Sequence, residues 1–447
     1  MRSRREFVRI GVSSIASLAL KPFALLPAFA QSGPDYRALV CVFLHGGNDA
    51  NNMIIPMDDS SYRAYAEVRG NLALTANTLS PVVQSISGMP YAFHSGLSGL
   101  SSLFSTRALA VVANVGPLIQ PLTRIQYQNG LAPVPLNLFS HPDQQVHWQT
   151  SLAQGTSATG WAGRVADYIA RNGINPSQFP SFLSVAGNAL LDTGEITQPV
   201  AIAPGERLAL SGFNQSPASQ ARWQALTHLL SIESGLSLVQ AANDRLAHSI
   251  GDADALNNAL SKATPLRTRF PGSNLGAQLS QVAQIIQVHL RLGMRRQIFF
   301  CSLGGFDTHA DQAPILQHLY RILDQGLAAF HEAMQELAME RSVTTFTESD
   351  FGRLFRPNTS DGTDHAWGGH QIVLGGAVRG GEIFGRFPAF QLGGLDDAAD
   401  NGSWIPNISV EQYGATLCSW FGVPDSILPT IFPNLQNFRS RNLGFMT

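Results

Sequence analysis

The chain has 447 residues, of which 44% are hydrophobic and 13% are charged. This much apolar material can form a large core, and it excludes a mostly disordered chain. The formal net charge of −2 and the absence of a basic stripe exclude nucleic acid as a partner. The 41 glycines and 25 prolines indicate many loops, which favours a large α/β or β-rich enzyme over a helical bundle.

The first 30 residues predict a signal peptide. Arg4 and Arg5 precede a mostly apolar run that ends in Ala28-Phe29-Ala30, a site suited to signal peptidase. The paired arginines resemble a twin-arginine signal, which implies export of the folded chain by the twin-arginine translocase. An uncleaved signal anchor is the alternative. No other apolar run is long enough to span a bilayer, so we expect a periplasmic or secreted protein with no stable membrane span after cleavage.

The first predicted strand, 39–49, is apolar until it ends in two glycines, Asn48 and Asp49. Glycines allow the backbone to approach a ligand closely, and the Asp49 carboxylate can hold a metal ion. A plain turn is the alternative, because Gly, Asn and Asp are common turn residues.

An apolar run at 108–116, which does not end in a polar cluster, predicts another strand, and a long insertion follows at about 117–275. Within it, Ser140 and Pro142 predict a helix start, with Ser140 as N-cap. The Ser140 hydroxyl could instead act as a nucleophile, because helix N-terminal amides stabilise negative charge. We expect the insertion to be an elaboration of one domain covering 31–447, with a separable cap as the alternative.

Helical apolar spacing at 276–294 leads into a predicted strand at 297–309, which ends in Asp307 and His309. A carboxylate oxygen and an imidazole nitrogen suit zinc or manganese. A hydrogen-bonded loop pair is the alternative.

A second predicted helix, 312–340, leads into a strand at 342–353 that carries Glu348 and Asp350. Residues at alternate positions of a strand point to the same side, so both carboxylates could face one pocket. Two close carboxylates repel each other unless a cation or a proton lies between them. An ion pair of either carboxylate with Arg353 is the alternative.

Asp364, His365 and His370 follow in a glycine-containing loop, and His370 could equally be a buried histidine with satisfied hydrogen bonds. The alternation of helices with continuously apolar strands predicts an α/β fold, with a mostly parallel central sheet and helices on both faces. The polar clusters would then meet at the carboxyl ends of the strands, where such sheets bind ligands. Their joint occurrence favours a metal site.

Four motifs in this order resemble the bacterial DUF1501 proteins: FLHGGND, GGFDTHADQ, TESDFGR and GTDHAWGGH. The resemblance covers essentially the whole mature chain. It places the chain in the alkaline phosphatase–sulfatase superfamily, which implies an alkaline phosphatase-like fold, one or two metals, and hydrolysis or transfer of phosphate and sulfate esters. By motif, the resemblance implies these metal ligands: Asp49, Asp307, His309, Asp350 with Glu348 as a substitute, and a late histidine from the Asp364-His365 or His370 positions.

The chain also departs from the superfamily pattern. The usual Ser-Asp-His-Gly is Ser349-Asp350-Phe351-Gly352 here, so one histidine ligand is lost. Asp307 and His309 are more closely spaced than the usual Asp-x-x-x-His pair. Either His365 and His370 rebuild the site in another arrangement, or the site has degenerated.

The leading hypothesis is therefore an exported metal-dependent hydrolase of a small-molecule or polymer-linked phosphate or sulfate ester. Ser140 would attack beside one or two divalent ions, with zinc as the first choice and manganese, magnesium or calcium as alternatives. Arg353 would clamp the ester oxygens, and His141 or His365 would donate a proton to the leaving group. The alternative is a non-catalytic exported binding or assembly protein that retains the fold with a degenerate site.

Overall fold

The computed structural model describes residues 35–447 except 76–77, 199, 206–207, 209–212, 214–215 and 233–234. The predicted signal peptide lies outside the described residues and stays a prediction. Arg37 to Thr447 packs as one unit. None of the described helices combines the length and the hydrophobicity needed to cross a bilayer.

The first strand of the chain, β1 (Arg37–His45), lies between two strands from the second half of the sequence. It pairs in parallel with β8 (Arg296–Gly304) on one side and with β9 (Val343–Ser349) on the other. All its residues except the two terminal ones are buried, because helices cover both faces of the sheet. The predicted strands at these three places are confirmed.

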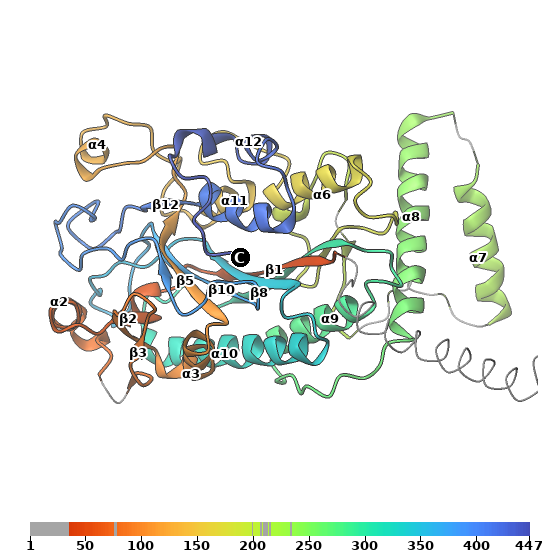
Figure 1. The fold of residues 1–447 in the computed structure, drawn as a ribbon. Coiled ribbons are helices and arrows are strands. Elements are labelled where there is room, and N and C mark those ends of the chain that lie inside the picture. Colours follow the sequence, from red (N-terminus) through yellow and green to blue (C-terminus); the bar gives the residue numbers. More distant parts are fainter. Residues whose placement is uncertain are drawn as a thin grey trace, which may run out of the picture. The chain divides into compact units, whose positions relative to one another are not determined.

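The central sheet is mixed but mostly parallel (Figure 1). Its strand order is β11-β5-β10-β9-β1-β8-β6-β7, and β12 also pairs with β5. The further strands are β5 (Leu109–Gly116), β6 (Phe182–Ser184), β7 (Val200–Ala201), β10 (Gly369–Leu374), β11 (Ile383–Phe384) and β12 (Ile408–Ser409). The sequence analysis did not predict β10, which runs antiparallel to both β9 and β5.

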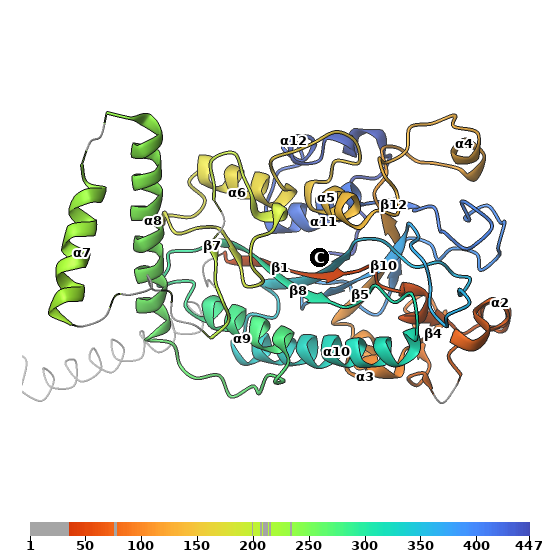
Figure 2. The same ribbon diagram turned by 180° about the vertical axis from the view of Figure 1, so that it is seen from behind.

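Helices pack on both faces of this sheet, which confirms the predicted α/β class (Figures 1 and 2). One face carries α3 (Ser98–Ser105), α9 (Asn274–Gln287) and α10 (Gln312–Glu336). The other carries α5 (His141–Thr150), α6 (Trp161–Arg171), α11 (Val410–Phe421) and α12 (Leu428–Ile431). On this second face the ring of Phe346 packs between those of Trp161 and Tyr413, at centroid distances of 5.9 and 6.1 Å. These rings form part of the main apolar core.

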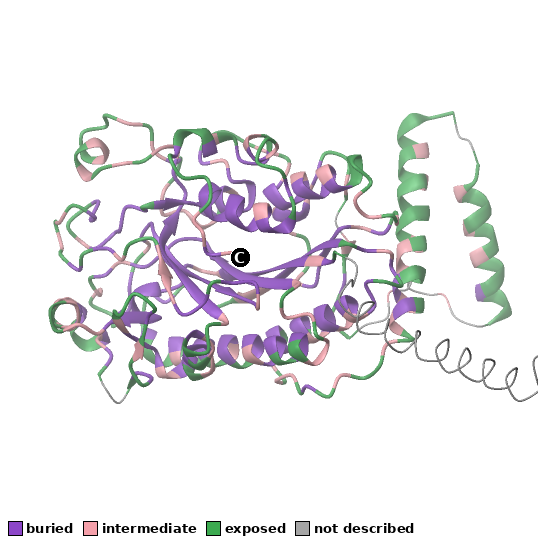
Figure 3. Ribbon diagram, in the orientation of Figure 1, coloured by how far each residue is buried: buried purple, intermediate pink, exposed green. Residues whose placement is uncertain are grey.

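The remaining elements lie around this sheet. They are α2 (Asp59–Arg69), α4 (Arg124–Gln128), α7 (Pro217–Leu230), α8 (Ser237–Leu260), and a small antiparallel sheet of β2 (Ile54–Pro56), β4 (Pro90–Phe93) and β3 (Val83–Gln84). The predicted insertion at about 117–275 contributes β6 and β7 to the central sheet, whereas its helices α7 and α8 are exposed along most of their length (Figure 3).

The antiparallel strand β10 determines what covers the carboxyl edge of the sheet. Because β10 runs antiparallel to β9, it begins at the edge of the sheet where β9 ends. The segment 350–368 that connects the two strands must therefore lie over that edge. It folds back on itself through a backbone bridge between Arg353 and His365. β1 and β8 end at the same edge, where the loops that follow them begin, so three segments distant in sequence meet there.

Candidate metal centre

The loops after β1 and β8 contact each other backbone to backbone. Gly46 has a φ of +111°, and a Cβ at this position would lie 2.4 Å from the backbone nitrogen of Asp307. The amide of Phe306 donates a hydrogen bond to the carbonyl of His45 (3.1 Å). Glycine is therefore required by the neighbouring loop, and this close packing sets the position of Asp307.

The buried Arg353 side chain connects the loops that follow β1, β8 and β9. Its guanidinium has no exposed surface and donates to the carboxylate of Asp307 (2.5 Å). The same side chain donates to four backbone carbonyls: Gly46, Gly47, Phe306 and Thr363. The five hydrogen bonds of Arg353 are all to protein atoms, so it does not face an open pocket as a clamp on ester oxygens would.

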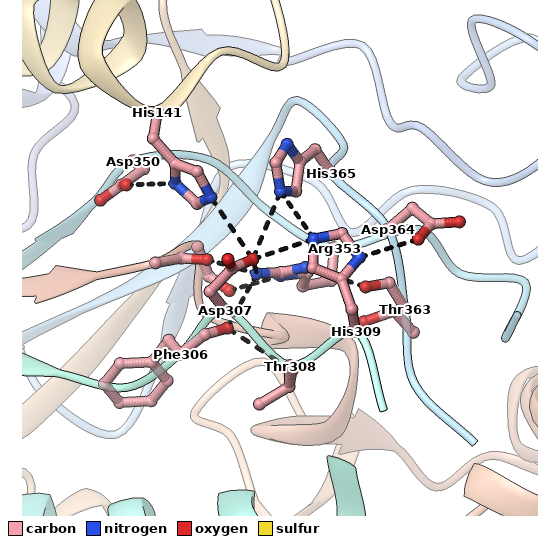
Figure 4. Close-up of polar contacts among 12 residues, drawn as sticks. His141, Phe306, Asp307, Thr308, His309, Asp350, Arg353, Thr363, Asp364 and His365 are labelled. Atoms are coloured by element: carbon pink, nitrogen blue, oxygen red, sulfur yellow. Dashed lines mark hydrogen bonds and ion pairs between the residues drawn. The ribbon is translucent and has the colours of Figure 1, made fainter. Parts of the chain in front are cut away.

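Three histidines converge on one oxygen of Asp307 (Figure 4). The Nε2 atoms of His141, His309 and His365 lie 3.3, 3.0 and 3.3 Å from Asp307 Oδ1. His141 is the first residue of α5, whereas the other two come from the loops after β8 and β9. The ligand atoms of His141, Asp307 and His365 all lie within 4.8 Å of one another.

The opposite ring nitrogen of each histidine faces a hydrogen-bond acceptor. The Nδ1 atom of His141 contacts Asp350 Oδ2 at 2.7 Å, and that of His309 contacts Asp364 Oδ1 at 2.9 Å. The Nδ1 atom of His365 contacts the carbonyl oxygen of Phe139 at 2.7 Å. Since carboxylates and carbonyls accept, all three protons belong on Nδ1, and the lone pairs on Nε2 point toward Asp307.

Arg353 supplies a positive charge to Asp307 Oδ1 from the buried side, but two of the histidine nitrogens face each other without one. The Nε2 atoms of His309 and His365 are 2.9 Å apart, so two lone pairs would face each other unless a cation or an additional proton lies between them. A tetrahedral zinc ion with bonds of about 2.0–2.1 Å holds its ligand atoms about 3.3 Å apart. The observed separations from Asp307 fit that spacing, and acceptors on the outer nitrogens are usual for metal-binding histidines.

The centre is open to solvent on one side. The side chains of Asp307 and His309 are 49% and 45% exposed, whereas those of His141 and His365 are about half as exposed. Four protein ligands would complete a tetrahedral zinc site, so water or a substrate would have to enter from this open side as a fifth ligand.

The charges of the site favour ligands in the deprotonated state. Burial raises the pKa of Asp307, but the Arg353 hydrogen bond and charge outweigh it and lower this pKa to about 2. Burial also raises the pKa of Asp364, but hydrogen bonds from His309 and Asn358 outweigh this effect, and the pKa lies below its ordinary value. Burial lowers the pKa of His365, so this ring is neutral at neutral pH.

Asp49 does not join this cluster. Its buried carboxylate pairs with the equally buried Arg69 and accepts from the side chains of Gln312 (2.5 Å) and Asn51 (3.2 Å). A metal ion at Asp49 would have to displace the Arg69 guanidinium. The structure therefore corrects the expectation for Asp49, for which the sequence offered no sign that an arginine 20 residues later is its partner.

Glu348 and His370 also lie outside the cluster. β9 ends at Ser349, so its alternation does not extend to Asp350, and burial raises the pKa of Glu348 well above its usual range. His370 is buried in β10, where its Nδ1 accepts from the backbone amide of Asn114 at 3.0 Å. Burial lowers the pKa of His370 to about 3. His370 is buried, as the alternative expected, but only its Nδ1 has a hydrogen-bond partner, and its Nε2 is buried without one among the described residues. Asp350 and Asp364 contact the histidines and not the shared oxygen.

Ser140 is the N-cap residue of α5, as expected, but its side chain does not cap the backbone. Its hydroxyl donates to Asp143 Oδ2 at 2.5 Å. The next residue, His141, is the one that reaches the cluster. The sequence analysis assigned His141 to proton transfer and did not predict the contributions of Gln145, which donates to Asp350, and of the Phe139 carbonyl. A backbone carbonyl leaves no signal in a sequence.

The pattern that defines the family described as "Protein of unknown function (DUF1501)" matches residues 36–402. The chain belongs to the DUF1501 family. The DUF1501 match contains every residue of the histidine cluster. No curated protein matches the chain.

Several solved structures are distantly similar to this DUF1501 protein. "Ps i-CgsB" is 8% identical, with a TM-score of 0.35 and coverage of 89% of this chain and 77% of that chain. The C-terminal periplasmic domain of EcEptC from Escherichia coli, in complex with Zn, is 12% identical, with a TM-score of 0.31 and coverage of 77% and 74%. A putative sulfatase from Bacteroides thetaiotaomicron is 9% identical, with a TM-score of 0.31 and coverage of 90% and 75%. At these TM-scores the likeness carries no conclusion about the chemistry of this chain.

Proposed function

We propose that this DUF1501 protein is an exported metal-dependent hydrolase of a phosphate or sulfate ester, with one divalent ion held by His141, Asp307, His309 and His365. The observation that carries the proposal is the convergence of three imidazole Nε2 atoms on Asp307 Oδ1, with every Nδ1 facing an acceptor. Imidazole ligands favour zinc, whereas magnesium and calcium prefer oxygen ligands.

A single ion fits better than two. Among the residues that the structure describes, only His141, Asp307 and His365 form a group of His, Cys, Asp or Glu side chains whose ligand atoms all lie close enough to share an ion. His309 is not in that group, but its Nε2 lies 3.0 Å from Asp307 Oδ1 and 2.9 Å from His365 Nε2. Two other carboxylates predicted as metal ligands have protein partners, Arg69 for Asp49 and His141 with Gln145 for Asp350.

The bound ion would supply a Lewis acid that polarises the ester oxygen and lowers the pKa of water. Asp350 and Gln145 hold His141 in place from the buried side. Arg353 fixes Asp307 and neutralises its charge. The exposed side of Asp307 and His309 leaves room for an ester to approach.

The nucleophile is either Ser140 or water. Asp143 accepts a hydrogen bond from the Ser140 hydroxyl, and Ser140 directly precedes His141. A short rotation of this side chain would turn its oxygen away from Asp143. The Ser140→Ala variant distinguishes the two, because turnover that survives this change would identify water as the nucleophile.

A metal-binding protein without turnover is the second candidate. The observation that favours it is Arg353, whose five hydrogen bonds go to backbone carbonyls and Asp307. The superfamily-type reaction needs positive charge on the ester oxygens, and the ion alone would have to supply it.

Metal content and turnover test the proposal together. Protein purified from metal-replete medium should contain about one zinc per chain, and it should hydrolyse at least one of a set of chromogenic phosphate monoesters, phosphate diesters and sulfate esters. Since His365 touches the shared oxygen, His365→Ala should lose both the metal and the turnover. His370→Gln is the matched control, because this buried histidine lies outside the cluster and its loss should preserve both.

Protein that binds no divalent metal under these conditions would overturn the enzyme and the metal site at once. Stoichiometric metal without turnover on any ester would favour the non-catalytic candidate. Export rests on the amino-terminal sequence pattern alone.

A further inference from the structure

The turn before α5 has an unusual backbone. Asn137 and Phe139 have φ angles of +47° and +75°, in the left-handed region that residues other than glycine rarely adopt. Asparagine tolerates this region, but an aromatic residue there is an outlier. Such backbone persists only where surrounding contacts enforce it, and it clusters at functional sites.

Polar contacts hold this turn closed. The amide of Ser140 donates to the carbonyl of Asn137 at 3.2 Å, and the Gln144 side chain donates to the same oxygen at 3.4 Å. The Asn137 side chain donates to Asp143 Oδ1 at 3.1 Å. The Phe139 ring is partly buried against the apolar cluster that contains Trp367.

The left-handed backbone at Phe139 directs its carbonyl oxygen to His365 Nδ1, 2.7 Å away. Two residues later the same chain delivers His141 into the cluster. The other two histidines obtain their acceptors from carboxylate side chains, Asp350 and Asp364. His365 alone depends on a backbone oxygen, whose direction is set by the φ and ψ angles of the turn.

We propose that the left-handed turn Asn137–Phe139 is a positioning element of the metal centre. The Phe139 carbonyl keeps the proton of His365 on Nδ1, so that Nε2 presents its lone pair to the ion. Phe139 touches neither the ion nor a substrate and acts through His365. This inference rests on the proposed metal centre but not on ester hydrolysis.

Two substitutions at Phe139 separate the backbone from the side chain. Phe139→Gly removes the ring but accepts a φ of +75° without strain, so the carbonyl stays in place. Phe139→Val keeps an apolar side chain, but a β-branched residue opposes positive φ, so the carbonyl turns away from His365. The proposal expects Phe139→Val to lower zinc affinity about 10–100-fold and Phe139→Gly to retain it.

The measurements are zinc affinity by chelator competition and the proton position on His365 by ¹⁵N NMR of the metal-free protein. Wild type and Phe139→Gly should carry the proton on Nδ1, whereas Phe139→Val should shift it to Nε2. Ala338→Val is the matched control, because Ala338 has a φ of +53° after the end of α10, at a site outside the cluster. It should destabilise the fold while leaving zinc affinity and the His365 proton unchanged.

The opposite order of the two variants, with Phe139→Gly impaired and Phe139→Val intact, would show that an apolar side chain matters and not the backbone, and it would overturn the proposal. Wild-type affinity and a wild-type His365 proton in both variants would overturn it as well. Failure of wild type to bind zinc would instead remove the proposed function, and the His365 proton in the metal-free protein would still report on the turn.

Discussion

At the scale of single residues, the polar cluster after β1 has a role that differs from the expected one. The sequence predicted that Gly46 and Gly47 let the backbone approach an ion held by Asp49. In the structure these glycines approach the loop of Asp307 and the side chains of Phe351 and Arg353. Asp49 itself is neutralised by Arg69. The glycines thus support the proposed metal centre indirectly, by setting the position of Asp307, one of its proposed ligands.

Replacement of Gly46 tests this support. In Gly46→Ala the new Cβ would lie 2.4 Å from the amide nitrogen of Asp307, so the loops must separate and zinc affinity should fall. Gly88→Ala is the control, because Gly88 has a φ of +87° with nothing within 4 Å of the added Cβ. The control should cost about 1–2 kcal/mol for the left-handed backbone alone, and Gly46→Ala should cost more.

Chemical denaturation and chelator competition measure the two effects of these substitutions. Equal losses of stability in the two variants, with normal zinc affinity in both, would contradict the role assigned to Gly46.

At the scale of elements, the proposed metal centre depends on α5, which belongs to the predicted insertion. Asp350 follows β9 and has no exposed surface, and its Oδ2 accepts from His141 and Gln145, both on α5. This carboxylate therefore attaches the helix to the sheet and orients His141.

Asp350→Asn should weaken zinc binding about 10–100-fold, because an amide cannot match a carboxylate as the acceptor for His141. Asp192→Asn is the matched control: Asp192 is also a buried aspartate, it contacts no residue of the cluster, and burial raises its pKa to about 7. The control should keep normal zinc affinity in a chelator competition. Normal affinity in Asp350→Asn would show that His141 needs no carboxylate behind it.

The sequence predicted helices and strands better than it predicted which polar side chains contact one another. Apolar runs and helical spacing located β1, β5, β8, β9, α9 and α10 because burial acts on each segment separately. The strand β10 was missed, since its six residues follow a polar loop without a distinct apolar run. Asp307, His309 and His365 were predicted and do meet, whereas Asp49, Glu348 and His370 face other partners. Which polar groups pair is decided by tertiary packing between distant segments, so spacing along the chain could not separate the two sets.

At the scale of the whole molecule, buried histidines make the fold sensitive to acid. Burial lowers the pKa of His94 to about 4 and that of His370 to about 3, against 6.5 for an ordinary histidine. Below pH 6.5 the unfolded chain therefore binds more protons than the folded one, and stability falls as the pH is lowered. Each of these two histidines should contribute a slope of about 1.4 kcal/mol per pH unit, down to its folded pKa.

His370→Gln should remove one of these slopes, because glutamine does not titrate and its oxygen can accept from the amide of Asn114. Unfolding by urea at a series of pH values between 4 and 8 measures the difference. Identical pH dependence in the variant and the wild type would show that His370 is already protonated, or hydrated, in the folded protein.

The position of β1 in the middle of the sheet has a consequence for synthesis. Arg37 pairs with Arg296, so the first strand has no parallel neighbour until roughly 260 further residues have left the ribosome, which takes on the order of 10–50 s. During that time an apolar segment with unpaired backbone is available to other chains, as an exposed edge strand would be. A chaperone that holds the amino-terminal region during translation would therefore have a physical task here, and the yield of folded protein should depend on it more than that of a protein whose first strand pairs early.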